Sequence, residues 1–145
     1  MTSAPGKAYL LVIGVFYIAF GGIGLALSFN GLLNASTWDI TRPTASEISW
    51  NIYYIILLIW ALLRITAGVV GVIYRTRLEK SALLMTVGIV CFGYAILYMI
   101  SSSMIIYGGL VDGLGASLLI GVFVPALYVF GAYKNLTEYK AQSSK

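Results

Sequence analysis

The chain has 145 residues with nine basic and five acidic side chains, and 60% of its residues are apolar or aromatic. Only 10% are charged, whereas about a quarter are charged in an ordinary soluble domain. A mean hydropathy of +0.93 leaves too little polar surface to cover a water-soluble fold of this size. The composition excludes a soluble globular domain and predicts an all-α integral membrane protein.

Four segments are apolar and long enough to cross a bilayer, because about 20 apolar residues in a helix span roughly 30 Å of hydrocarbon. We expect one transmembrane domain over residues 1–145, with spans over 8–29, 49–74, 82–107 and 113–133. An outer loop is expected over residues 30–48, where Thr44 and Glu47 have the spacing of a capping box at the start of the second span.

The basic residues predict the orientation of these spans. Arg42 stands alone on one side, and the basic residues that flank the spans on the other side are Lys7, Arg75, Arg77, Lys80, Lys134, Lys140 and Lys145. Because Lys and Arg in short loops are retained in the cytoplasm, we expect a four-helix bundle in the cell membrane with both termini cytoplasmic. The net charge of +4 is then a topology signal and not a sign of nucleic-acid binding.

Small residues recur at helical spacing along every span. Between helices in a bilayer the hydrophobic effect contributes little, so helices associate through close packing of small residues and through hydrogen bonds. We therefore expect these stripes to line the bundle interior and the Leu, Ile, Val and Phe side chains to face lipid. The glycines expected at helix contacts are Gly14, Gly21, Gly24, Gly68, Gly71 and Gly88.

Arg64 is a charged residue near the middle of the second span, where an ionised side chain costs about 2.5–3.5 kcal/mol. No carboxylate is expected at its depth, so its partners should be phenols, which accept hydrogen bonds and offer ring faces, or a carbonyl that a proline has left without its helical donor. Two roles stay open for Arg64: a polar clip that fixes helix register, and an anion or lipid-headgroup site. The groups expected around it are Tyr17, Tyr94, Tyr128, Gly121 and Pro125.

The chain lacks the residues that several classes of chemistry require. The chain has no histidine and a single cysteine, Cys91, in the third expected span. Histidine metal sites, histidine general bases and disulfide relays are therefore not expected, and neither is a metal or a cofactor. Cys91 is expected to act as a small packing residue.

Four segments together resemble small uncharacterised four-span integral membrane proteins of Gram-positive bacteria: Pro5–Lys7, Gly14–Gly22, Arg64–Gly71 and Val124–Asn135. The resemblance implies the fold and the compartment, and it brings no activity or catalytic residue with it.

Three functions remain open from the sequence. The first is a non-enzymatic multi-pass membrane protein that acts as an interaction or accessory subunit, with the bilayer and either itself or another membrane protein as partners. The second is an oligomeric channel or transporter for a small anion or another small solute. The third is an intramembrane enzyme acting on a lipid or a thiol, which would have only Arg64, tyrosines and serines as functional groups.

Overall fold

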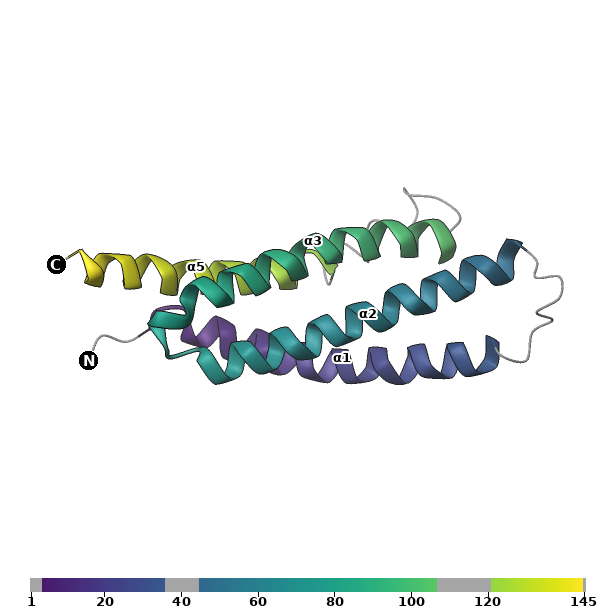
Figure 1. The fold of residues 1–145 in the computed structure, drawn as a ribbon, viewed down its shortest axis with the longest axis horizontal. Coiled ribbons are helices and arrows are strands. Elements are labelled where there is room, and N and C mark those ends of the chain that lie inside the picture. The colour runs from purple at the N-terminus through teal and green to yellow at the C-terminus, as the bar shows by residue number, and fades with distance from the viewer. Residues whose placement is uncertain (1–3, 36–44, 107–120, 145) are drawn as a thin grey trace.

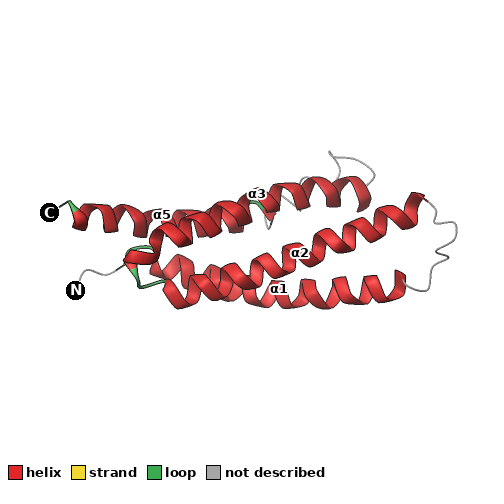
Figure 2. Cartoon of the chain, viewed as in Figure 1, coloured by secondary structure: helices red, strands yellow, loops and turns green. Residues whose placement is uncertain are grey.

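The structure is a computed structural model that describes residues 4–35, 45–106 and 121–144. Within these ranges the chain is helical and contains no strand (Figure 2). Its elements are α1 (Lys7–Ala35), α2 (Ala45–Tyr74), the short 3₁₀ helix η1 (Leu78–Lys80), α3 (Ser81–Ile106) and α5 (Phe123–Ser143). The predicted all-α class is confirmed for this part of the chain.

Three helical segments are long and apolar enough to cross a membrane: Lys7–Asn34, Trp50–Tyr74 and Leu78–Ser102. Helices suit this solvent because they satisfy their backbone hydrogen bonds internally, where lipid offers no partner. The prediction of helices long and apolar enough to span a membrane is confirmed for these three. The fourth expected span, 113–133, lies partly outside the described residues, which resume in α5.

The first connection is shorter than the sequence predicted. Helix α1 continues to Ala35 and α2 begins at Ala45, so residues 30–35 and 45–48, expected in the outer loop, are helical. A helix can continue through such residues because its backbone hydrogen bonds are made within the helix itself. Thr44, the expected cap, lies outside the described residues.

The helices run nearly side by side, with α1 against α2 and α3 against α5 (Figure 1). The two ends of the chain and the connection between α2 and α3 lie at one end of the bundle, and α5 extends past the other helices there (Figure 1). We call this the basic end. The basic side chains that its segments carry are Lys7, Arg75, Arg77, Lys80, Lys134 and Lys140.

Glycines bring α1 and α2 into close contact. A Cβ atom placed on Gly68 would lie 2.6 Å from the Gly14 carbonyl oxygen, and one on Gly21 would lie 3.0 Å from the Ala61 carbonyl oxygen. One on Gly24 would lie 3.1 Å from the Cβ of Ala61. A larger residue would separate the two backbones, so the absence of side chains at these points sets how closely α1 and α2 approach.

Candidate functional site

Aromatic rings from α1, α2, α3 and α5 meet in the middle of the bundle. Trp60 of α2 and Tyr17 of α1 are each 1% exposed, and their ring centroids lie 6.5 Å apart in an edge-to-face arrangement. On its other side Tyr17 stacks on Tyr128 of α5 at 5.7 Å. Trp60 also stacks on two rings of α3, Tyr94 at 5.9 Å and Tyr98 at 6.3 Å. We call this group of five rings the aromatic cluster.

Arg64 lies against the aromatic cluster. Its guanidinium carbon is 4.5 Å from the centroid of the Trp60 ring, and the two residues are neighbours on one face of α2 because they are four positions apart. Tyr17, Tyr98 and Cys91 are near enough to interact electrostatically with the guanidinium. A cation over an indole is stabilised by about 0.5–2 kcal/mol, which offsets part of the cost of a charge at this depth.

Three phenols at or near the cluster have hydrogen-bond partners. The Tyr128 hydroxyl donates to the Ala67 carbonyl at 3.0 Å, and the Tyr94 hydroxyl donates to the Ile56 carbonyl at 3.2 Å. The Tyr98 hydroxyl lies 3.1 Å from that of Tyr53. The first two bonds attach α5 and α3 to the backbone of α2, and the third joins a side chain of α3 to one of α2.

Three other buried polar atoms in the same place have no hydrogen-bond partner among the described residues: the Tyr17 hydroxyl, the indole nitrogen of Trp60 and Nε of Arg64. All three atoms carry hydrogen-bond donors, and the Tyr17 oxygen also accepts. A buried donor without a partner costs about 1–3 kcal/mol.

In the structure, two of the tyrosines expected to bond to Arg64 bond to the backbone of α2. Tyr17 lies near the guanidinium, but Tyr94 and Tyr128 direct their hydroxyls to backbone carbonyls of α2. Pro125 is buried in the first turn of α5, a position where its missing N–H is not needed. At Gly121 a Cβ atom would meet no described atom within 4 Å, and a contact between the Gly121 carbonyl and Arg64 stays a prediction.

The ring that Arg64 contacts, Trp60, was not among the residues singled out from the sequence. Its spacing of four residues before Arg64 on one helix is a signal that could have identified it.

The remaining two glycines expected at helix contacts both adjoin Tyr128. A Cβ atom on Gly71 of α2 would lie 2.8 Å from its ring, and one on Gly88 of α3 would lie 3.0 Å from it. Tyr128 is fully buried and stacks on Tyr17 of α1. One side chain of α5 therefore contacts α1, α2 and α3.

A second polar contact, also missed from the sequence, lies at the basic end. The side chain of Asn135 is fully buried. Its Oδ1 accepts a hydrogen bond from the Gly6 N–H at 2.7 Å, and its Nδ2 donates to the Arg75 carbonyl at 3.1 Å. Asn135 thus joins the start of the chain, the end of α2 and α5.

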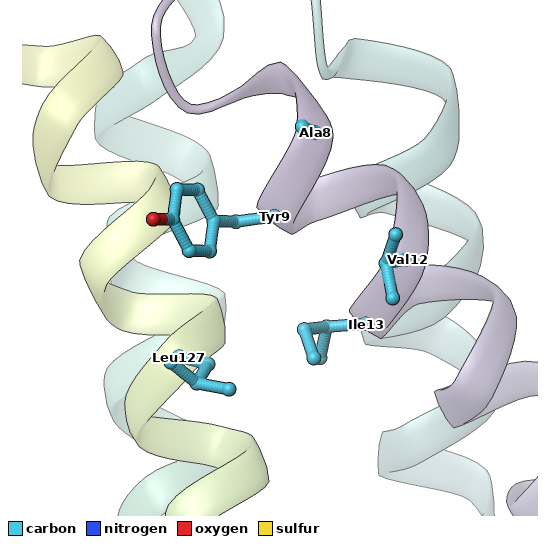
Figure 3. Close-up of a pocket in the computed structure, with 5 residues that line it drawn as sticks. All are labelled: Ala8, Tyr9, Val12, Ile13 and Leu127. Atoms are coloured by element: carbon cyan, nitrogen blue, oxygen red, sulfur yellow. The ribbon is translucent and has the colours of Figure 1, made fainter.

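An apolar groove lies between α1 and α5 near this end (Figure 3). It has a volume of about 290 Å³, and its lining residues are Ala8, Tyr9, Val12, Ile13 and Leu127. The ammonium group of Lys134 is 5.2 Å from the centroid of the Tyr9 ring. A cation therefore stands beside an apolar groove.

No known protein family, curated protein or solved structure matches the chain. The function has to be inferred from the described residues and their geometry.

Proposed function

We propose that the protein is a non-enzymatic multi-pass membrane protein that acts through contacts, as an interaction or accessory subunit. The observation that carries this proposal is the packing of the interior. The α1–α2 contact is closed at Gly14 and Gly68, and the space between the four α-helices is filled by Tyr128, Tyr17 and Trp60. A protomer packed in this way offers its outer surfaces for function.

The proposal includes four spans in the cell membrane. The apolar first half of α5, together with the residues before it, would supply the fourth span, in line with the uncharged run 113–133. The gathering of basic side chains at the basic end supports a cytoplasmic location for both termini. A membrane-impermeant maleimide should label Asn30→Cys in intact cells and Lys140→Cys only after permeabilisation, and the reverse pattern would contradict this orientation.

Two surfaces suit contacts with partners. Lipid acyl chains would fill the apolar groove between α1 and α5, with an anionic headgroup near Lys134. The last turns of α5 pass beyond the other helices and expose Tyr139 and Lys140, which makes them the natural contact for another protein, either a second copy or a different membrane protein.

Site-specific photo-crosslinking in native membranes tests the contact with a protein. A photoreactive residue at Tyr139 should give one adduct of defined mass, and the same residue at the buried Ala132 should give none. Native mass spectrometry of the complex then shows whether the partner is a second copy. Absence of an adduct at position 139 and at other exposed positions of α5, with a monomer by mass, would contradict the proposal.

One observation favours the alternative function, an oligomeric channel or transporter for a small anion. Arg64 is charged, its Nε has no hydrogen-bond partner among the described residues, and it would attract an anion. Liposomes containing the protein should show no protein-dependent anion flux if the contact function is correct. Flux that appears with the natural chain and disappears in Arg64→Leu would replace the contact function with the transport function.

A further inference from the structure

The start of α1 contacts α5 closely at the basic end. The Gly6 N–H donates a hydrogen bond to the Asn135 side chain at 2.7 Å. A Cβ atom on Gly131 of α5 would lie 2.8 Å from the Cβ of Tyr9 and 3.3 Å from the Gly6 carbonyl oxygen. The two backbones therefore come close at this level, where a larger residue at position 131 would separate them.

One turn away from this contact the two helices leave the apolar groove between them (Figure 3). Ile13 follows Tyr9 by four positions on α1, and Leu127 precedes Gly131 by four positions on α5. Both therefore lie about one turn further from the basic end. The Tyr9 ring extends toward α5 at the end of the groove where this contact lies (Figure 3). A volume of about 290 Å³ between α1 and α5 is not filled by the described part of the chain.

A lysine is held at the basic end of this groove. The ammonium group of Lys134 is 5.2 Å from the centroid of the Tyr9 ring and 4.7 Å from that of Phe130. These two rings meet edge-on at 5.4 Å. The carboxylate one turn further along α5, that of Glu138, accepts a hydrogen bond from the Gln142 side chain at 2.9 Å. The lysine therefore directs its charge to the rings at the groove, where an anion can reach it.

The spacing along α5 matches the dimensions of a phospholipid. Lys134 lies seven positions after Leu127, which is about 10 Å along a helix. The polar layer on each side of the hydrocarbon is about 5–8 Å thick, so the ammonium group reaches the headgroups when Leu127 contacts the hydrocarbon. The exposed Lys7 stands one position before Ala8, which lines the groove. It adds positive charge at the same end.

We propose that one anionic phospholipid binds in this groove as a structural ligand that joins α1 to α5. One acyl chain lies against Val12, Ile13 and Leu127, and the phosphate group lies at the Lys134 ammonium group. An anionic lipid is favoured over a zwitterionic one, because the amine of a zwitterionic headgroup is repelled by the lysine that attracts the phosphate. This binding rests on the proposed function, which places lipid in the groove and the basic end in the cytoplasm.

Native mass spectrometry of the full chain in a non-ionic detergent, titrated with phosphatidylglycerol and with phosphatidylcholine, tests the binding. The natural chain should bind one phosphatidylglycerol with a Kd about fivefold or more below that for phosphatidylcholine, which is the contribution of one lysine at an anionic surface. Equal Kd values for the two lipids would overturn the proposal.

Substitutions of Lys134 test the headgroup contact. Lys134→Gln should raise the Kd for phosphatidylglycerol by about fivefold and leave that for phosphatidylcholine unchanged, whereas Lys134→Arg keeps the charge and should keep the preference. Lys140→Gln removes a charge from an exposed position of α5 beyond the groove and is the matched control. If Lys140→Gln weakens binding as much as Lys134→Gln, the lipid follows net charge and not the groove, which would overturn the assignment.

Substitutions of alanine on α1 test the acyl-chain contact. Ala8→Leu places a larger side chain in the groove and should raise the Kd for both lipids by about fourfold, the loss expected when one methylene leaves an apolar contact. Ala19→Leu, at an exposed position of α1 outside the groove, should leave both Kd values unchanged. Equal effects of the two substitutions would overturn the place of the chain in the groove.

Thermal unfolding in the same detergent tests the structural role. Phosphatidylglycerol should raise the unfolding midpoint of the natural chain more than phosphatidylcholine does, and Lys134→Gln should remove this difference. An unchanged midpoint would overturn the structural role. Competition by sodium phosphate, or a dimer that forms in place of the lipid complex and is lost in Ala8→Leu, would show a different occupant and overturn the lipid. Crosslinking at Tyr139 does not involve the groove, so a missing adduct there contradicts the contact function and leaves the lipid result unchanged.

Discussion

Adjacent glycines on α1 should respond in opposite ways to the same substitution. A Cβ atom on Gly21 would lie 2.6 Å from Cγ1 of Ile65, 3.0 Å from the Ala61 carbonyl oxygen and 3.2 Å from the Ile65 backbone nitrogen. A Cβ atom on Gly22 would meet no described atom within 4 Å. Gly21→Ala therefore presses on the backbone of α2, which cannot rotate away, whereas Gly22→Ala adds a methyl group to an open face.

The size of the difference follows from two contributions. Both substitutions gain the same helix propensity, about 0.8–1.0 kcal/mol, so this contribution cancels in the comparison. Overpacking at Gly21 costs about 1–3 kcal/mol. The free energy of unfolding of Gly21→Ala should therefore be lower than that of Gly22→Ala by about 1–3 kcal/mol, which corresponds to roughly 5-fold to 150-fold in the unfolding equilibrium constant.

Equilibrium unfolding in mixed micelles of a mild detergent and sodium dodecyl sulfate, followed by tryptophan fluorescence, measures this difference. The natural chain should fall about 0.8–1.0 kcal/mol below Gly22→Ala and at or above Gly21→Ala. Equal unfolding midpoints for Gly21→Ala and Gly22→Ala would refute the inference that α1 and α2 are held in contact through the Gly21 face.

Two further substitutions test the polar contacts. Asn135→Leu should lower the free energy of unfolding by about 2 kcal/mol or more, because the Gly6 N–H and the Arg75 carbonyl both lose their partner. Thr137→Ala, at an exposed position of the same helix, should change the free energy of unfolding by less than about 0.5 kcal/mol. Equal effects of the two substitutions would contradict the role of Asn135. Tyr128→Phe should cost only about 1 kcal/mol, since one hydrogen bond is lost and the ring stays, but Tyr128→Ala should cost about 3–5 kcal/mol. Thermal unfolding in detergent measures both pairs, and a Tyr128→Ala variant as stable as Tyr128→Phe would show that the ring does not hold the helices together.

The composition of the chain located the helices because a segment that crosses lipid must be apolar and must satisfy its own backbone hydrogen bonds. Uncharged apolar segments that cross lipid must be helical and long. The sequence therefore located Lys7–Asn34, Trp50–Tyr74 and Leu78–Ser102 to within one residue at three of their six ends and to within five residues at the others. The ends themselves were less accurate, as the extension of α1 to Ala35 shows, because polar residues outside the hydrocarbon can continue a helix or leave it.

Side-chain pairing could not be obtained in the same way. Spacing along one helix places a residue on a face, but it does not say which groups of the facing helices lie at the same depth. Tyr17, Tyr94 and Tyr128 were equivalent candidates for Arg64 by sequence. Only the offsets between helices direct the hydroxyls of Tyr94 and Tyr128 to carbonyls of α2 and leave Tyr17 within electrostatic range of the guanidinium. Asn135 was missed for the same reason, because its partners are distant in sequence.

The sequence by itself determined the solvent, the helical class and the one charge within a span that needs an explanation. These follow from local composition, since the cost of placing a charge or an open backbone in lipid depends on each segment alone. The tertiary structure decided that Arg64 lies on Trp60, that Tyr128 fills the centre of the bundle and that three donors at Arg64 have no partner within the described residues. Those outcomes depend on how four helices are placed against one another, which is set by packing between residues far apart in the chain.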